Sequence, residues 1–166
     1  MRCVKVLGRI SLLLVLMAFA ACSDRNALLD RNAEIPNAHW AVNDEALFEL
    51  QVTDTVSQHN FFINVRNTEA YAYRNLYVFL TTTFPNGKSA RDTIGLMLAD
   101  PMGRWYGQGS GYLSSKRYHS NAIMYQYNRR FPIEGNYTFS IQQAMRTDTL
   151  GGILNIGMRI EKQEGA

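Results

Sequence analysis

Short runs of alternating apolar and polar side chains dominate the chain from Trp40 onward. Side chains at successive strand positions point to opposite faces, so each run predicts a strand with one buried and one solvated face. In the run at 152–161, Leu154 and Met158 fall on one face and Arg159 on the other. Runs of this kind, rich in β-branched and aromatic residues, predict strands at 46–52, 60–66, 75–84, 92–98, 136–143 and 152–161.

Turn-forming residues separate these strands, at "FPNGK" (84–88), "ADPMG" (99–103) and "FPIEG" (131–135). No stretch keeps a helical period long enough to compete with the strand pattern. The segment 113–128 has no clear period and is either a long connection or a pair of edge strands. We predict an all-β fold, an antiparallel, immunoglobulin-like β-sandwich of about seven or eight strands.

Tyr137 stands at the start of a predicted strand, two residues after Gly135. This spacing resembles the tyrosine corner of immunoglobulin-like sandwiches, in which the phenol hydrogen-bonds back to the upstream backbone. A plain turn followed by a strand would have the same sequence pattern, so both interpretations stay open.

The N-terminal segment 1–21 has the pattern of a secretory signal peptide. Arg2, Lys5 and Arg9 precede the uncharged stretch "ISLLLVLMAFAA". As a helix this stretch would span about 18 Å, well short of a hydrocarbon core of about 30 Å. A basic start, a short apolar segment and small residues at its end are typical of a signal segment and not of a membrane span.

Cys22 directly follows Ala20 and Ala21, and this ending resembles the bacterial lipoprotein box. In such proteins cleavage precedes the cysteine, and its sulfur receives a diacylglyceryl group. We therefore predict lipidation of Cys22, with a cleaved secreted protein that keeps an unmodified cysteine as the alternative. Each buried methylene contributes about 0.8 kcal/mol, so two or three acyl chains would hold the protein on a bilayer.

Removal of residues 1–21 changes the charge of the chain. The full sequence has 17 basic and 14 acidic residues, and the signal segment carries three of the basic ones, which leaves 14 of each. The basic balance that could favour nucleic acid therefore disappears, and nucleic-acid binding is not expected. Cys3 leaves with the signal, so no disulfide can form within one mature chain.

The remaining residues divide into two parts. Residues 22–38 contain the lipidated cysteine and a polar stretch with little periodicity, which we interpret as a flexible tether. The alternative is that Leu28 and Leu29 pack onto the domain. Residues 39–166 are predicted to form the β-sandwich domain.

Catalytic patterns are missing from the sequence. The glycine-rich stretch 103–112 lacks the lysine and the helix of a phosphate-binding loop. His39, His59 and His119 have no short ligand spacing, and no Gly-x-Ser-x-Gly elbow occurs. We expect no enzymatic activity, no cofactor or metal, and no small-molecule substrate.

Two short segments are candidates for interaction with other proteins. Arg104, Trp105 and Tyr106 combine residue types that are enriched at protein interfaces, and Met145 and Arg146 follow a predicted strand. Trp105 is either a core side chain or a contact surface. Aromatic side chains of this region could also stack on sugars, so an envelope glycan-binding module is the alternative function.

The order of several motifs resembles one protein family. "NFFINVRNTEAYAYRNLYVFLTTTFPNG", "DTIGLMLADPMGRWYGQGSG", "FPIEGNYTFSIQQAMR" and "LGGILNIGMRIEK" are similar to the gliding-motility lipoproteins of the GldH family, over about 40–162. The resemblance implies a non-enzymatic accessory or scaffold component of the gliding machinery and its associated secretion system. It also implies partners among other envelope proteins.

The residues after Cys22 bear on location. Ser23, not aspartate, follows the cysteine, which favours sorting to the outer membrane. Surface export in these bacteria usually accompanies an acidic run, and only Asp24 is present, so we expect a domain that faces the periplasm.

Three Asp-Thr-apolar triplets resemble sites at which the same bacteria O-glycosylate exported proteins. They make Thr55, Thr93 and Thr149 candidates for modification. Asp-Thr is also common where strands begin, which is the purely structural explanation.

Overall fold

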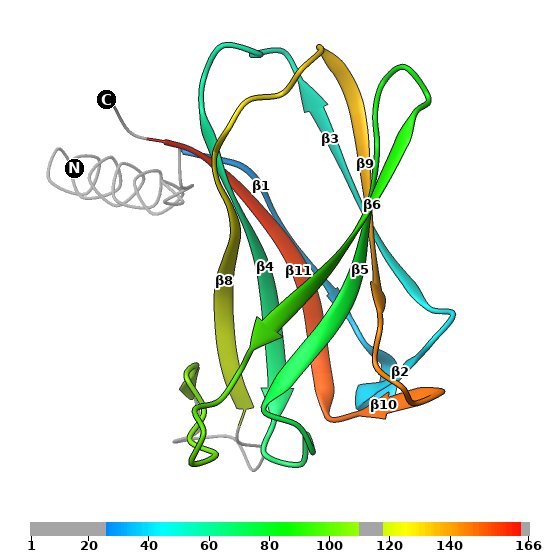
Figure 1. The fold of residues 1–166 in the computed structure, drawn as a ribbon, viewed down its shortest axis with the longest axis vertical. Helices are drawn as coiled ribbons and strands as arrows, with labels where there is room; N and C mark the ends of the chain where they lie inside the picture. The colour runs from blue at the N-terminus through cyan, green and yellow to red at the C-terminus, as the bar shows by residue number, and fades with distance from the viewer. Residues whose placement is uncertain (1–25, 110–117, 164–166) are drawn as a thin grey trace, which may run out of the picture.

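The computed structural model describes residues 26–109 and 118–163, and these fold into two antiparallel sheets packed face to face (Figure 1). The first sheet, sheet I, has the strand order β1-β11-β4-β8-β7. Its strands are β1 (Ala27–Glu34), β11 (Ile153–Lys162), β4 (His59–Thr68), β8 (Tyr118–Arg129) and the two-residue β7 (Gln108–Gly109).

Sheet II has the order β3-β9-β5-β6, and a short ribbon of β2 and β10 closes one corner. Its strands are β3 (Glu45–Val52), β9 (Gly135–Gln143), β5 (Asn75–Thr83) and β6 (Ser89–Met97). The ribbon consists of β2 (His39–Ala41) and β10 (Thr149–Gly151), and one 3-10 turn, η1 (Pro36–Ala38), precedes it. The predicted all-β sandwich is confirmed.

Each of the six predicted strands is present, as β3, β4, β5, β6, β9 and β11. Their alternation has the expected cause, because β3 buries every second residue from Ala46 to Val52. The same holds for β9, where Tyr137, Phe139 and Ile141 point into the core.

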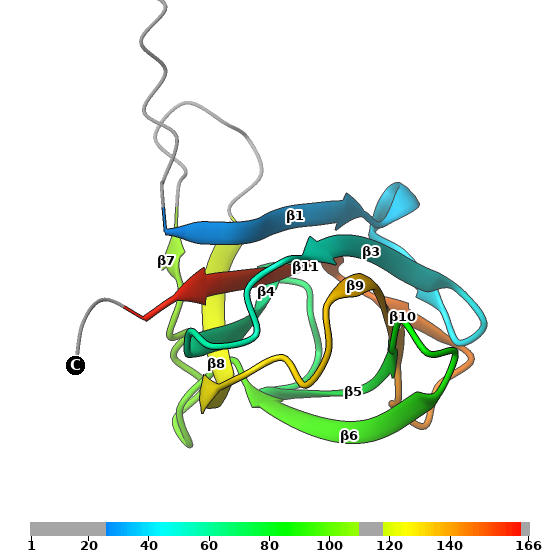
Figure 2. The same ribbon diagram turned by 90° about the horizontal axis from the view of Figure 1, so that it is seen from above.

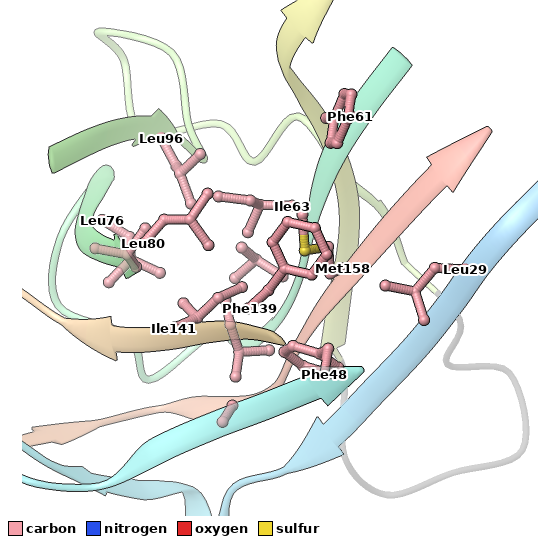
Figure 3. Packing of buried hydrophobic residues seen from close by; sticks show 14 of the residues in the cluster. Leu29, Phe48, Phe61, Ile63, Leu76, Leu80, Leu96, Phe139, Ile141 and Met158 are labelled. Carbon is pink, nitrogen blue, oxygen red and sulfur yellow. The ribbon is translucent and has the colours of Figure 1, made fainter. Parts of the chain in front are cut away.

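The core lies between the inner faces of the two sheets (Figure 3). Ile63 and Met158 of sheet I and Leu76 and Ile141 of sheet II are fully buried. At roughly 25 cal/mol for each Å² of apolar surface removed from water, such side chains supply the main stabilising term.

The predicted tether is wrong for residues 27–34, because they form β1 at the edge of sheet I. β1 pairs antiparallel with β11, and Leu29 is only 6% exposed. Gly157 of β11 permits this approach, since a Cβ there would lie 2.5 Å from the carbonyl oxygen of Arg31. Leu29 is the one residue of β1 that is buried, and the others are exposed or half-buried. Because most of its positions are solvated, an edge strand of this kind has a polar sequence that resembles a linker.

Of the ambiguous segment 113–128, residues 118–128 belong to one long strand, β8, which ends at Arg129, and residues 113–117 lie outside the described residues. The tyrosine corner is also present: the Tyr137 hydroxyl donates to the carbonyl oxygen of Ile133 at 2.8 Å. Tyr137 is 1% exposed, so this hydrogen bond fixes the turn between β8 and β9 from inside the core.

The sandwich has two ends, which we call upper and lower as in Figure 1. At the upper end β1 begins, β11 ends, and the connections 53–58, 84–88 and 130–134 join the strands (Figure 1). The lower end carries the connections 69–74, 98–107 and 144–148. Ten residues of β11 at about 3.3 Å each separate the two ends by about 30 Å.

The predicted signal segment 1–21 and Cys22 lie outside the described residues. Within the described ranges, no helix is long and apolar enough to cross a membrane.

Candidate interaction surface

Large apolar side chains are exposed at the lower end of the sandwich. Tyr73, Tyr77, Met97, Met102 and Tyr106 are 40%, 46%, 47%, 83% and 60% exposed. We call these five residues the tyrosine–methionine surface. They come from the β4–β5 connection, the start of β5, the end of β6 and the connection that follows β6. Exposed apolar side chains that gather in this way are typical of protein interaction sites.

Backbone hydrogen bonds hold these segments together. The N–H groups of Leu98 and Ala99 donate to the carbonyl oxygen of Arg74, at 2.8 and 3.0 Å. The N–H of Tyr106 donates to the carbonyl oxygen of Leu98 at 2.9 Å. The connection after β6 is therefore fastened to the one before β5, and the exposed side chains of both are presented at the same end.

Tyr77 lies across Gly95 of the neighbouring strand. A Cβ on Gly95 would stand 2.9 Å from Cε1 of Tyr77, so the absence of a side chain at this position lets the ring lie flat on β6. Tyr77 and Gly95 are paired in register on β5 and β6. The glycine thus sets the position of an exposed aromatic ring on the outer face of sheet II.

Met145 reaches the same strand from the other side. The N–H of Tyr77 donates to the sulfur of Met145 at 3.4 Å, and the N–H of Ala144 donates to the carbonyl oxygen of Tyr77 at 2.8 Å. Met145 is half-buried against the core, and Arg146 beside it is exposed. Met145 therefore packs at the strand edge, and Arg146 is the more accessible of the two.

A tight turn around Asp100 presents Met102 and Arg104. One carboxylate oxygen of Asp100 accepts the N–H groups of Met102 and Arg104, each at 2.9 Å, and the other lies 2.7 Å from Nε of Arg104. These hydrogen bonds, above all those from Arg104, hold the pKa of the Asp100 carboxyl below its ordinary value. Gly103 has φ of 82°, which the turn requires. Met102 stands exposed at the tip.

Trp105 is half-buried and packs against two other rings. Its ring stacks on His119 with centroids 5.5 Å apart and tilts against Tyr71 at 6.2 Å. The Tyr71 hydroxyl donates to the carbonyl oxygen of Asn75 at 2.9 Å, and burial raises the pKa of this phenol. Trp105 thus packs against Tyr71 and His119, while the side chain of Tyr106 next to it is exposed.

The structure brings the two predicted interaction segments to the same end. Arg104–Tyr106 and Met145–Arg146 lie in the two connections that flank the lower ends of β5 and β6. Four residues of this surface were not predicted from the sequence: Tyr73, Tyr77, Met97 and Met102. Alternation marks Tyr77 and Met97 as outward positions but does not show which connections lie beside them, and Tyr73 and Met102 lie in connections, where no alternation applies.

The three candidate glycosylation residues lie far apart. Thr55 is half-buried in the upper connection after β3, where Asp54 accepts hydrogen bonds from Val56 and Ser57. Thr93 is exposed in the middle of β6, the edge strand of sheet II. Thr149 is exposed at the start of β10.

Acidic and imidazole groups do not converge in the part of the chain that the structure describes. Among these residues no three histidine, cysteine, aspartate or glutamate side chains lie close enough to bind a metal ion. His59 is fully buried beside Phe131, with ring centroids 5.2 Å apart and both ring nitrogens unpaired. Burial lowers the pKa of its imidazole.

Comparison with known proteins identifies the family. The model of the GldH lipoprotein family matches residues 27–160. The chain is 33% identical over 156 residues to a "Gliding motility lipoprotein GldH homolog" of Christiangramia forsetii, which covers 90% of this chain and 91% of the relative. It is 27% identical over 161 residues to the "Gliding motility lipoprotein GldH" of Flavobacterium johnsoniae, over 92% and 95% of the two chains. The family match begins at the start of β1 and ends near the end of β11, so the chain belongs to the GldH lipoprotein family.

Proposed function

We propose that the chain is a membrane-anchored, non-enzymatic lipoprotein of the cell envelope and an accessory or scaffold component of the gliding motility machinery and its associated secretion system. The observation that carries this proposal is the exposed apolar surface at the lower end of the sandwich, opposite the end at which β1 begins and at which a lipidated Cys22 would lie. The names of the two relatives, which refer to motility and to a lipoprotein, support it.

Lipidation of Cys22 would place the upper end of the sandwich at the membrane. Only residues 23–26 separate Cys22 from the start of β1. Five Cα steps at about 3.6 Å reach at most about 18 Å. The upper end therefore stays close to the lipid head groups, and the lower end extends about 30 Å further out, the length of a ten-residue strand.

This orientation presents the tyrosine–methionine surface to the compartment that the domain faces. Tyrosine and arginine supply much of the binding energy at protein interfaces, and methionine adapts to irregular partners. Arg104 and Arg146 flank the surface with exposed charge. A partner protein of the envelope could dock there without displacing the domain from the bilayer.

The residues after Cys22 support the rest of the location. Ser23 favours the outer membrane, and the lack of an acidic run favours a domain in the periplasm. The proposal includes cleavage of the signal peptide and attachment of palmitate or related acyl groups to Cys22.

Site-directed photocrosslinking in the native host tests the docking surface. A photoreactive residue at Met102 should form adducts with other motility or secretion proteins, identified by mass spectrometry. The same residue at Leu47, which is 62% exposed on the outer face of β3, is the control and should form few.

A pair of equally exposed tyrosines sharpens this test. Tyr106→Ser removes a ring that is 60% exposed at the lower end, and Tyr127→Ser removes one that is 59% exposed on β8 near the upper end. We expect Tyr106→Ser to lower co-purification of the crosslinked partner several-fold and Tyr127→Ser to leave it unchanged. Equal effects, or none, would refute a docking role for the lower end.

A glycan-binding module is the second candidate function, and a polar groove on sheet I is the surface that favours it. The outer face of sheet I carries a polar groove of about 330 Å³, whose side chains include Asp30, Asn32, Asn64, Arg66, Asn155 and Arg159. Amide, carboxylate and guanidinium groups match the hydroxyls of a sugar. Arg159 donates to Asp30 at 2.9 Å, so this part of the groove is already ordered.

Trp105, whose ring could also stack on a sugar, does not line this groove, so two variants can distinguish the two places. Binding to envelope polysaccharide that is lost in Asn64→Ala but kept in Trp105→Ala would support the groove. Binding lost only in Trp105→Ala would assign the site to the lower end, and no binding by the unmodified chain would refute a glycan-binding role.

A further inference from the structure

A large hollow opens between the two sheets at the upper end. It has a volume of about 670 Å³, within the range of about 300–1,000 Å³ that is typical of small-molecule sites. Its lining residues come from β4, β8 and the connection after β8 on one side, and from β5, β6 and β9 on the other. Figure 2 shows the arrangement of these strands seen from the upper end.

The interior of this pocket is aromatic. Phe61, Phe131 and Tyr137 form its deep wall and are at most 5% exposed. Phe84 and Tyr125 are half-buried and line it nearer to solvent. The rings of Phe61 and Tyr125 meet edge to face with centroids 6.1 Å apart, and those of Phe61 and Phe131 are tilted with centroids 5.5 Å apart, so the rings of the wall pack against one another. These rings offer an apolar wall against which a hydrocarbon chain could pack.

The mouth of the pocket is charged. Arg129 and Arg130 are exposed on one side, and neither side chain forms a hydrogen bond or ion pair with another described residue. Ala90 and Asp92 of β6 form the opposite side. Asp92 lies close enough to Tyr125 to add to the rise that burial causes in the pKa of that phenol. Two cations face one anion across an apolar opening.

The position of the pocket indicates its ligand. It opens beside the 130–134 connection, at the end where β1 begins. On the proposed function, on which this inference rests, that end lies against the lipid head groups. Apolar rings inside and arginines at the rim match a molecule with a hydrocarbon chain and an anionic head.

We propose that this pocket binds a membrane phospholipid, with an acyl chain against Phe61, Phe131 and Tyr125 and the phosphate at Arg129 and Arg130. Asp92 on the opposite rim selects a head group that also carries an ammonium. No bond is made or broken. The bound lipid adds a second, reversible contact with the bilayer and keeps the upper end of the sandwich turned toward it.

Photocrosslinking of the whole chain in its native membrane tests the proposal. Ala90 and Ser89 are neighbours on β6, and only Ala90 lines the pocket. The substitution Ala90→p-benzoylphenylalanine should give an adduct with the mass of an intact phospholipid, and Ser89→p-benzoylphenylalanine should give several-fold less. Equal yields at the two positions would overturn the proposal, because both residues would then be sampling bulk lipid.

Charge variants test the phosphate contact. With the photoreactive group at position 90, Arg129→Gln combined with Arg130→Gln should reduce the lipid adduct several-fold. Arg91→Gln is the matched control, because Arg91 stacks over Phe79 on the outer face of sheet II. A protein adduct at position 90, an adduct with free fatty acid, or equal losses in the two sets of variants would contradict a phospholipid site.

Lipidation of Cys22 and phospholipid binding in the pocket can be refuted independently. Labelled palmitate that does not enter the chain would refute lipidation of Cys22, whatever happens at position 90. Palmitate incorporation without a phospholipid adduct at position 90 would refute the pocket and leave the anchor in place.

Discussion

Leu29→Ala tests the strand that replaces the predicted tether. Leu29 is 6% exposed on β1, next to β11, and belongs to the buried core (Figure 3). If residues 27–34 were a flexible tether, truncation of this side chain would leave stability unchanged. Because β1 is part of sheet I, we expect the domain to lose stability.

The expected magnitude follows from burial and position. A buried leucine changed to alanine costs about 2–5 kcal/mol, and the cost is smaller where the surroundings can close the cavity. β1 is an edge strand with one neighbour, so we expect about 2–3 kcal/mol, in the lower part of that range.

Urea unfolding followed by circular dichroism measures this loss. With a slope of about 2 kcal/mol per molar, the midpoint should fall by about 1–1.5 M at unchanged slope. Leu47→Ala, at a position that is 62% exposed, is the control and should stay within about 0.5 kcal/mol of the unmodified chain. Equal midpoints for the two variants would show that β1 is not packed on the domain. The link between Cys22 and the domain would then be longer than residues 23–26, and the upper end would no longer be held close to the membrane.

Three further predictions concern other parts of the domain. Tyr137→Phe removes the 2.8 Å hydrogen bond to the carbonyl oxygen of Ile133 and should cost about 1–3 kcal/mol in the same unfolding assay; no loss would remove the tyrosine corner from the account. Burial lowers the pKa of His59, so the unfolded chain binds this proton more readily, and stability should fall as the pH drops below about 6.5. His59→Phe should flatten that fall between about pH 7 and 5, and an unchanged profile would contradict it. Intact mass from the native host should show a glycan that Thr93→Ala removes, and a mass with acyl additions only would exclude glycosylation.

The regular strands of the domain could be predicted from sequence because their burial alternates. In β3, buried and exposed positions alternate at every step, with Leu47 as the one apolar residue on the exposed face, and the strand extends one residue beyond the prediction. β8 could not be predicted in this way. Half-buried Tyr125 and exposed Tyr127 place aromatic residues on a strand that borders an open pocket, and its pairing with β4 shifts register near Phe61. The resulting pattern has no clean period.

The candidate surface was predicted in part. Arg104, Trp105 and Tyr106 stood out by residue type, and Met145 by its place after a strand. That the two segments flank the same strand end depends on the pairing of β5 with β6 and β9, which no local pattern shows. The upper pocket was not predicted, because its walls come from five strands spread along the chain.

Depth-dependent quenching tests the orientation of the domain most directly. A fluorophore is attached at Lys88→Cys, in the upper β5–β6 turn, or at Met102→Cys, at the lower end. Nitroxide groups on the lipid heads of reconstituted bilayers then quench whichever dye lies near the membrane. The account predicts strong quenching at position 88 and little at position 102. Equal quenching, or stronger quenching at position 102, would contradict it.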